Sequence, residues 1–184
     1  MRKVVVYIAT SADGFIAKPD NDLSFLEIVQ REGEDYGYAS FMNTIDTILM
    51  GRKTYDWVLG AVGSNPHAHL DTYVLTRTPK PDYGKTRFYT RSIPNLIANL
   101  KAQPGKNIFC DGGAEIVHEL LSHNLIDEFI VSVVPVFVGN GIPLFKSGRP
   151  EQRLTVLSVT KFESGLVQIH YSVDSLNPNS SATT

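Results

Sequence analysis

A glycine, two adjacent cations and a threonine follow an apolar run without a spacer in the stretch TILMGRKTYD. Such a run predicts a buried strand, and a helix that begins at its end has free N–H groups with partial positive charge. Gly51 would let an anion approach the backbone, Arg52 and Lys53 add positive charge, and Thr54 adds a hydroxyl group. The stretch therefore predicts a site for phosphate oxygens. From this turn alone, a solvated surface turn with an exposed Arg-Lys pair is an equally good interpretation.

Two other predicted strands end in a similar way. NIFCDGGAEIVHELL passes from a strand through Gly112 and Gly113 directly into a helix, and VLTRTP ends in Thr76 and Arg77. The glycine pair could also be a tight turn whose dihedral angles require glycine. In a parallel sheet, however, the carboxyl ends of the strands lie on one edge, where the ligands of open α/β sheets bind. Three such ends on one edge predict a site for a long dinucleotide with several phosphates.

Strand-like and helix-like segments alternate along the chain. Short runs rich in β-branched residues, typical of strands buried on both faces, occupy residues 3–10, 47–50, 72–76, 107–110 and 129–138. Apolar residues recur at helical spacing in 34–45 and 114–124. On both sides of Glu163-Ser164-Gly165 apolar and polar residues alternate, which predicts an antiparallel hairpin over 154–173.

Together these segments predict one domain over residues 1–174. Its expected fold class is α/β, a three-layer α/β/α arrangement with a mostly parallel mixed sheet and an antiparallel carboxyl-terminal hairpin. The small and polar residues of 175–184 predict a disordered tail, because they cannot bury enough apolar surface to offset the entropy lost on ordering.

Composition and missing motifs exclude several classes of protein. A formal charge of −2 leaves no excess of cations for nucleic acid, and no apolar run approaches the roughly 20 residues of a membrane span. A single cysteine, Cys110, excludes an internal disulfide and favours a reducing, cytoplasmic location. The chain has no G-x-S-x-G elbow, P-loop or G-x-G-x-x-G fingerprint. Hydride transfer is the leading prediction that remains, because the cofactor then supplies the chemistry and the protein supplies alignment.

Metal binding is the alternative for the stretch HAHLD, where His67, His69 and Asp71 stand at alternate positions. No cysteine cluster or further set of ligands accompanies them, and they lie in a polar connecting loop. We therefore predict no metal site.

The sequence resembles the dihydrofolate reductase superfamily, and especially stand-alone proteins similar to the carboxyl-terminal reductase domain of the bifunctional riboflavin-biosynthesis deaminase-reductase. The resemblance extends from Lys3 to Val173. The resemblance depends on four stretches, which are in order along the chain SADGFIA, DTILMGRKTYD, DGGAEIVHELLSHNLIDEFIVSVVPVFVGNGIPLF and FESGLVQIHYSV.

The resemblance implies NADPH as cofactor, bound across the carboxyl edge of the sheet. It implies that Ala9 and Ile16 border the nicotinamide, and that the peptide between Gly112 and Gly113 is unusual, in the cis form. The other residues that it assigns to the cofactor are Gly51, Arg52, Lys53 and Thr54 at the pyrophosphate and ribose phosphate, Leu75, Thr76 and Arg77 at the adenine end, and Gly112, Gly113, Ala114, Glu115 and Ile116 along its middle.

The substrate implied by the resemblance is a small pyrimidine-like or pterin-like heterocycle. Folate is disfavoured, because Leu70 aligns with the arginine that dihydrofolate reductases use for the glutamate carboxylate, and KPDNDLSFLE replaces their Trp-Pro loop. A step of riboflavin synthesis fits, although nothing like the H-x-E and P-C-x-x-C motifs of the fused deaminase is present. Dihydrofolate reductase itself and a nucleotide-binding protein without catalysis are the alternatives.

Asp35 has two interpretations. It lies three residues before Tyr38 and seven before Met42, on the apolar stripe of the helix expected over 34–45, and it aligns with the acidic residue that dihydrofolate reductases use at the pterin. It is then a catalytic carboxylate that helps to protonate the substrate. The alternative is a residue that favours the start of a helix.

The apolar face of the expected carboxyl-terminal hairpin, together with the resemblance, predicts a two-fold homodimer.

Overall fold

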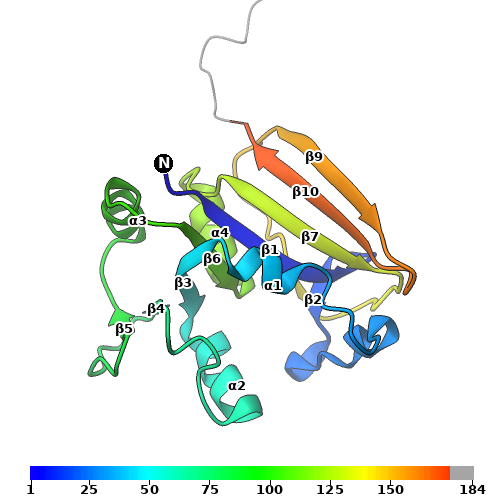
Figure 1. The fold of residues 1–184 in the computed structure, drawn as a ribbon, viewed down its shortest axis with the longest axis horizontal. Helices are drawn as coiled ribbons and strands as arrows, with labels where there is room; N and C mark the ends of the chain where they lie inside the picture. The colour runs from blue at the N-terminus through cyan, green and yellow to red at the C-terminus, as the bar shows by residue number, and fades with distance from the viewer. Residues whose placement is uncertain (175–184) are drawn as a thin grey trace, which may run out of the picture.

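The computed structural model describes residues 1–174, and the predicted disordered tail lies outside this part. Eight strands form one sheet in the order β5-β4-β3-β6-β1-β7-β10-β9 (Figure 1). The first six of these run parallel to one another, whereas β10 and β9 are antiparallel to their neighbours. The strands are β1 (Val4–Ser11), β3 (Ile45–Gly51), β4 (Asp71–Leu75), β5 (Thr86–Tyr89), β6 (Asn107–Gly112), β7 (Glu128–Val134), β9 (Leu154–Lys161) and β10 (Val167–Val173).

Helices cover both faces of the sheet and make the predicted three layers. On one face, α3 (Ile93–Ala102) and α4 (Ala114–Ser122) pack Leu96, Ile97, Val117 and Leu120 into a core cluster with the central strands. On the other face, α1 (Tyr38–Met42) places Phe41 in a second cluster. The β-branched residues of the central strands are buried between these layers, which is why their sequence is an unbroken apolar run.

Several elements differ from the sequence prediction. The helix expected over 34–45 is only the five-residue α1, because Tyr36 and Gly37 have left-handed φ angles of 58° and 84° that interrupt any earlier helical turn. Ile45 already belongs to β3. The sequence analysis did not predict β5 or α3, nor the short helices η1 (Pro19–Asn21) and η2 (Ser24–Val29).

The remaining elements connect the ends of the sheet. Helix α2 (Arg52–Val62) starts at the residue after β3, and the short strands β2 (Phe15–Ala17) and β8 (Ile142–Pro143) pair beside the end of β1. The predicted hairpin is β9 and β10, joined around Glu163-Ser164-Gly165. Within residues 1–174, no helix is long and apolar enough to cross a bilayer.

Candidate cofactor and substrate site

The sheet order brings the three predicted turns together. Strands β4, β3 and β6 are neighbours, Gly51 pairs with Leu75, and Met50 pairs with Gly112. The turns at 51–54, 75–77 and 112–116 therefore lie side by side on the carboxyl edge of the sheet. The end of β1 completes this edge, because the Cδ1 atom of Ile8 lies 3.9 Å from the position of a Cβ atom at Gly112.

Two helices begin at this edge without a side-chain cap. Gly51 precedes α2 and Gly113 precedes α4, and among residues 1–174 no side chain caps the first N–H groups of either helix. Each helix is long enough, with 11 and 9 residues, to carry a helix dipole. Free N–H groups with partial positive charge from two adjacent helices suit the oxygens of a diphosphate.

The glycines let the backbones of these turns approach closely. A Cβ atom at Gly51 would lie 3.1 Å from Cγ1 of Ile116, and one at Gly113 would lie 3.3 Å from Oγ1 of Thr54. Gly112 has a φ of +95°, a conformation that favours glycine. The Gly112–Gly113 peptide is cis, as the resemblance implied. The glycines therefore contribute a surface without side chains, against which a phosphate can lie.

The predicted basic residues have different surroundings. The Nε atom of Arg52 donates to both carboxylate oxygens of Asp56 at 2.7 Å, and its Cζ atom lies 5.6 Å from the centre of the Phe88 ring. Lys53 and Arg77 are exposed. The Arg52–Asp56 pair is a partly exposed contact within one helix, so it holds the guanidinium only weakly and leaves it able to turn toward an anion.

The other residues assigned to the cofactor contribute backbone, small side chains or apolar contacts. Leu75 and Ala114 are buried, so only their main chains are available to a ligand. Glu115 is exposed and pairs with Lys146, whose hydrogen bond and charge lower the pKa of Glu115. Ala9 is partly buried near the end of β1, and the partly buried Ile16 packs against the core. Thr76 accepts a hydrogen bond from the backbone N–H of Thr78 at 3.1 Å.

A cluster of titratable groups that sequence reasoning missed lies at the end of β6. The hydroxyl of Tyr38 and Nε2 of His67 are 3.0 Å apart. Burial, followed by the charge of Asp111, raises the pKa of Tyr38 to about 12. Burial also lowers the pKa of His67, with a further contribution from His69. Tyr38, His67 and Asp111 are 29 or more positions apart in the sequence and meet only in the fold.

Asp111 is the most perturbed carboxyl group among residues 1–174. It is the extra residue of an irregularity in β6, since Leu49 pairs with Cys110 and Met50 with Gly112. Burial raises its pKa to about 7. Within the described part of the chain burial alone shifts this pKa and no hydrogen bond to the carboxyl oxygens contributes, and Asp111 stands directly before the Gly112–Gly113 turn. Such a carboxyl group can hold a proton at neutral pH and deliver it to a ligand.

The hydrogen bonds of Asp35 are those of a residue that stabilises the start of a helix. Its carboxylate accepts hydrogen bonds from the N–H groups of Gly37 and Ala39, each at 2.9 Å. The side chain is exposed, and these bonds, with that from Ala39 the larger, lower its pKa. The prediction that Asp35 lies on the apolar face of a helix is wrong, because residues 35–37 are not helical. An ionised, exposed carboxylate is a poor proton donor at neutral pH.

We expect the Asp35→Ala variant to keep its turnover and to lose thermal stability, because two N–H groups at the start of α1 lose their acceptor. Asp35→Asn should lose less, since an amide oxygen still accepts. Steady-state rates and melting temperatures of the two variants check this. A large fall in turnover for both variants, at unchanged stability, would restore the catalytic interpretation.

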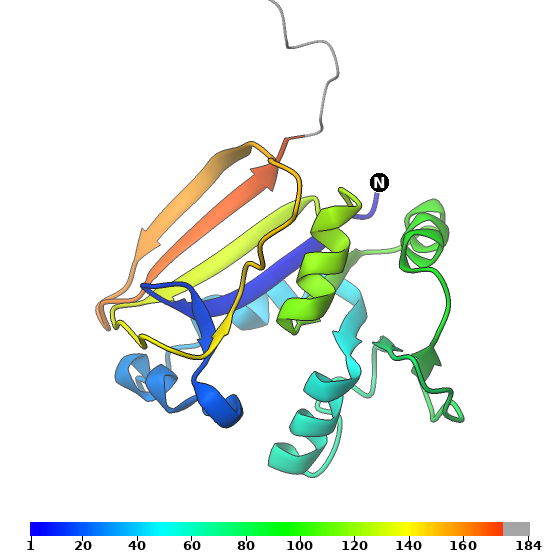
Figure 2. The same ribbon diagram turned by 180° about the vertical axis from the view of Figure 1, so that it is seen from behind.

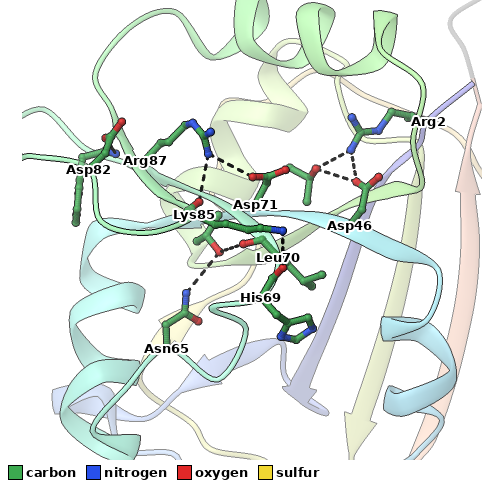
Figure 3. A network of polar contacts seen from close by, with 12 residues as sticks. Arg2, Asp46, Asn65, His69, Leu70, Asp71, Asp82, Lys85 and Arg87 are labelled. Carbon is green, nitrogen blue, oxygen red and sulfur yellow. Dashed lines mark hydrogen bonds and ion pairs between the residues drawn. The ribbon is translucent and has the colours of Figure 1, made fainter.

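Asp71 lies apart from the two histidines of the HAHLD stretch, whereas the ring centres of His67 and His69 are 6.4 Å apart. His67 points to Tyr38, whereas Asp71 begins β4 at the opposite edge of the sheet and bonds to Arg87 at 3.3 Å (Figure 3). The backbone oxygen of His69 accepts from Nζ of Lys85 at 2.9 Å. Within residues 1–174 no group of three or more potential ligands is placed to hold a metal ion.

The sheet order, the antiparallel outer strands and the glycine-rich carboxyl edge define an α/β protein with a dihydrofolate-reductase-like fold. The sequence profile of the RibD C-terminal domain matches residues 2–168, and the chain belongs to this family.

Three similar proteins illustrate this relationship. YwjB from Bacillus subtilis (strain 168) is 39% identical over 171 residues, which cover 92% of this chain and 97% of YwjB. A Shewanella sp. PV-4 structure named for riboflavin biosynthesis superposes with a TM-score of 0.86 and 29% identity, over 94% of this chain and 99% of that one. The diaminohydroxyphosphoribosylaminopyrimidine deaminase/5-amino-6-(5-phosphoribosylamino)uracil reductase from Thermotoga maritima gives a TM-score of 0.69 at 16% identity, over 94% of this chain and 57% of that one, which shows the shared fold. Residues 2–168 of the chain therefore form a RibD C-terminal-like domain.

Proposed function

We propose that the chain is an NADPH-dependent reductase that transfers hydride to a small pyrimidine- or pterin-like heterocycle. The observation that carries the proposal is the pair of adjacent helix N-termini, free of side-chain caps, beside Arg52 on the carboxyl edge of the sheet. The first substrate to test is 5-amino-6-(5-phosphoribosylamino)uracil, which the Thermotoga maritima protein is named for reducing. The predicted cytoplasmic location is part of this proposal.

The residues at the edge fit this cofactor by charge and shape. The N–H groups at the starts of α2 and α4 would hold the diphosphate, and Arg52 with Arg77 would meet the phosphate on the adenosine ribose. Gly51 and Gly113 let the two turns pack closely together, because a Cβ atom at either position would press on Ile116 or Thr54. When bound, NADPH would supply a hydride from its nicotinamide ring.

The substrate side needs a proton source. A carbon–nitrogen double bond that accepts a hydride at carbon must also accept a proton at nitrogen. Asp111 is the group best suited to hold that proton, because its pKa of about 7 keeps a fraction protonated at neutral pH. Tyr38, hydrogen-bonded to His67 beside it, would orient the polar edge of the heterocycle.

Folate fits this site poorly. Leu70 is partly buried and packs against the core cluster that contains Phe41, so the position aligned with the folate-binding arginine is apolar. A glutamate carboxylate placed there would lose its hydration without gaining a charged partner.

The test is NADPH oxidation by the purified chain against a panel of heterocycles, followed by the loss of NADPH absorbance. We expect turnover with the phosphoribosylamino-uracil or a related pyrimidine and none with dihydrofolate. Turnover of dihydrofolate with tight methotrexate binding would establish dihydrofolate reductase instead. Tight NADPH binding without oxidation by pterins, pyrimidines or quinones would leave a nucleotide-binding protein without catalysis.

We expect Gly113→Ala to weaken NADPH binding more than it lowers stability. The new Cβ atom would lie 3.3 Å from Oγ1 of Thr54, so the turn or the Thr54 side chain has to shift by a few tenths of an ångström beside the place where the diphosphate would sit. The control is Gly60→Ala in α2, where a Cβ atom meets nothing within 4 Å; it should bind NADPH normally and gain about 0.5–1 kcal/mol of stability. Isothermal titration and chemical unfolding of both variants measure the two effects, and equal losses for Gly113→Ala would indicate a turn with only a structural role.

A further inference from the structure

A hydrogen bond between Tyr38 and His67 joins two separate elements beside Asp111. Tyr38 is the first residue of α1, which lies over the central strands on one face of the sheet (Figure 1), and α4 covers the opposite face (Figure 2). His67 lies between α2 and β4. The ring centre of Tyr38 is 6.5 Å from that of Phe109, which stands two residues before Asp111 in β6. The pair therefore lies on the α1 face, next to the proposed proton donor and close to the carboxyl edge of the sheet.

Both members of this pair are uncharged at neutral pH. Burial, followed by the charge of Asp111, raises the pKa of Tyr38 to about 12, so its hydroxyl group keeps its proton. Burial, followed by the charge of His69, lowers the pKa of His67 from its ordinary value of 6.5, so its imidazole ring is neutral. A neutral imidazole has one N–H group and one bare nitrogen. The 3.0 Å contact between the Tyr38 hydroxyl and Nε2 of His67 is therefore a hydrogen bond with one of two polarities.

The chemistry of the two groups fixes this polarity. A phenol is a stronger acid than a neutral imidazole, and an imidazole nitrogen is a stronger base than a phenol oxygen. The stronger bond is therefore the one in which the Tyr38 hydroxyl donates to Nε2, with the proton of His67 on Nδ1. In this arrangement the one proton of the Tyr38 hydroxyl is occupied. Its oxygen can then accept a hydrogen bond from a ligand but cannot donate one.

Tyr7 shows the contrasting case of a hydroxyl group that is satisfied within the chain. Its ring centre lies 5.6 Å from that of Tyr38. The Tyr7 hydroxyl donates to the backbone oxygen of Tyr36 at 2.8 Å and accepts from Nε2 of Gln168 at 3.1 Å. Among residues 1–174 the Tyr38 hydroxyl has no partner besides His67. Of these two tyrosines, Tyr38 is therefore the one whose oxygen is left for a ligand.

We propose that His67 makes Tyr38 an acceptor in the substrate site, and that the site thereby selects heterocycles with an N–H donor on the edge that faces Tyr38. This proposal rests on the proposed function, because it concerns the substrate of the same site. Asp111 would donate to the nitrogen that receives the proton, and Tyr38 would accept from an amino group beside that nitrogen. An amino-substituted pyrimidine or pterin offers this pair of groups. A heterocycle with an oxygen in place of the amino group would set two acceptors against each other, which leaves both without a hydrogen-bond partner.

The polarity of the pair is measurable without substrate or cofactor. Nitrogen-15 NMR of the imidazole rings distinguishes a ring that carries its proton on Nδ1 from one that carries it on Nε2. The signals of His67 are identified by their absence in His67→Phe. We expect a neutral ring with the proton on Nδ1 at neutral pH. A proton on Nε2 would overturn the proposal, because His67 would then donate to Tyr38 and leave the Tyr38 hydroxyl as a donor.

The selection is tested by the binding of two small probes with NADPH present. 2-Aminopyrimidine has an N–H donor beside a ring nitrogen, and 2-methoxypyrimidine has an oxygen acceptor at the same place. NMR titration of the unmodified chain should show at least about tenfold tighter binding of 2-aminopyrimidine. His67→Phe should abolish this preference, because the Tyr38 hydroxyl can then donate to the methoxy oxygen. His69→Phe is the control at an exposed histidine, whose ring centre is 6.4 Å from that of His67, and it should keep the preference.

Equal affinities of the two probes for the unmodified chain, or an unchanged preference in His67→Phe, would overturn the proposal. Tyr38→Phe removes the acceptor itself and should also abolish the preference, and it decides the matter should His67→Phe lose its fold by circular dichroism. A chain that shows the expected proton position and preference but oxidises NADPH with no heterocycle supports the selection and contradicts the proposed reductase activity alone, because neither measurement involves turnover.

Discussion

Replacing Arg52 with Ala should weaken NADPH binding by about one to two orders of magnitude and leave NADH binding nearly unchanged. A charge-assisted hydrogen bond to phosphate contributes about 1.5–3 kcal/mol, and about 1.4 kcal/mol corresponds to a factor of ten in affinity. NADH has no phosphate on its adenosine ribose, so the substitution removes no such hydrogen bond from its complex. Titration of both cofactors, followed by the fluorescence of Trp57, the only tryptophan of the chain and a residue of α2, measures the effect.

The partners of Arg52 provide the controls. Asp56→Asn removes the carboxylate that now holds the guanidinium, so it should tighten NADPH binding. Arg87→Ala makes the same charge change beside Asp71, away from the carboxyl edge, and should alter neither cofactor's affinity. Lys53→Ala should have a smaller effect than Arg52→Ala, because an exposed, hydrated ammonium makes a weaker directed contact than a guanidinium. Equal losses of NADPH and NADH by Arg52→Ala would place Arg52 at the shared diphosphate, and no loss would make the basic pair a solvated surface.

The carboxyl edge could be predicted because its signals are local. A strand that ends in glycine and continues at once into a helix forms an anion site from consecutive residues, and parallel pairing then aligns such ends on one edge. Gly51 and Gly112 therefore lie where the sequence predicted. Helix α3 could also have been predicted from local signals. Ser92 is a residue typical of a helix start, Pro94 stands in the first turn, and apolar residues recur at helical spacing at Leu96, Ile97 and Leu100. In the structure the Ser92 hydroxyl accepts a hydrogen bond from the backbone N–H of Asn95 at 3.4 Å.

The position of Asp35 and the role of Asp111 could not be predicted in this way. The position of Asp35 was predicted by counting along an expected helix. Tyr36 and Gly37 have left-handed φ angles, so no helix forms at that point of the chain. The environment of Asp111 depends on an irregularity in strand pairing and on Tyr38, which comes from a distant part of the chain. Neither feature leaves a periodic pattern in the sequence, so the burial that raises the pKa of this carboxyl group is visible only in the folded chain.

Asp111→Asn should lower turnover by about 100-fold or more, the usual contribution of a general acid, without changing NADPH affinity. Asparagine has nearly the same shape but no acidic proton to deliver. In the unmodified chain, turnover should fall as the pH rises through about 7, because the protonated form of Asp111 is then lost. In Asp111→Asn this step of the pH profile should be absent. An unchanged rate and profile would exclude Asp111 as the proton donor.

The same substitution should stabilise the fold at alkaline pH. The pKa of Asp111 is raised from 3.8 to about 7, so the folded chain binds the proton more tightly than the unfolded chain. Below pH 3.8 Asp111 is protonated in both states and does not change the free energy of unfolding. As the pH rises from 3.8 to about 7, the unfolded chain releases this proton more readily, and the free energy of unfolding falls progressively. A shift of this size corresponds to an upper limit of about 4 kcal/mol. Asn carries no charge at any pH, so the stability of Asp111→Asn relative to the unmodified chain should increase over this range and then stay constant. Urea unfolding at several pH values measures it. A gain in stability together with the loss of turnover is the combination expected of a partly buried carboxyl group that acts as a proton donor, whereas a structural carboxyl group would lose stability on substitution.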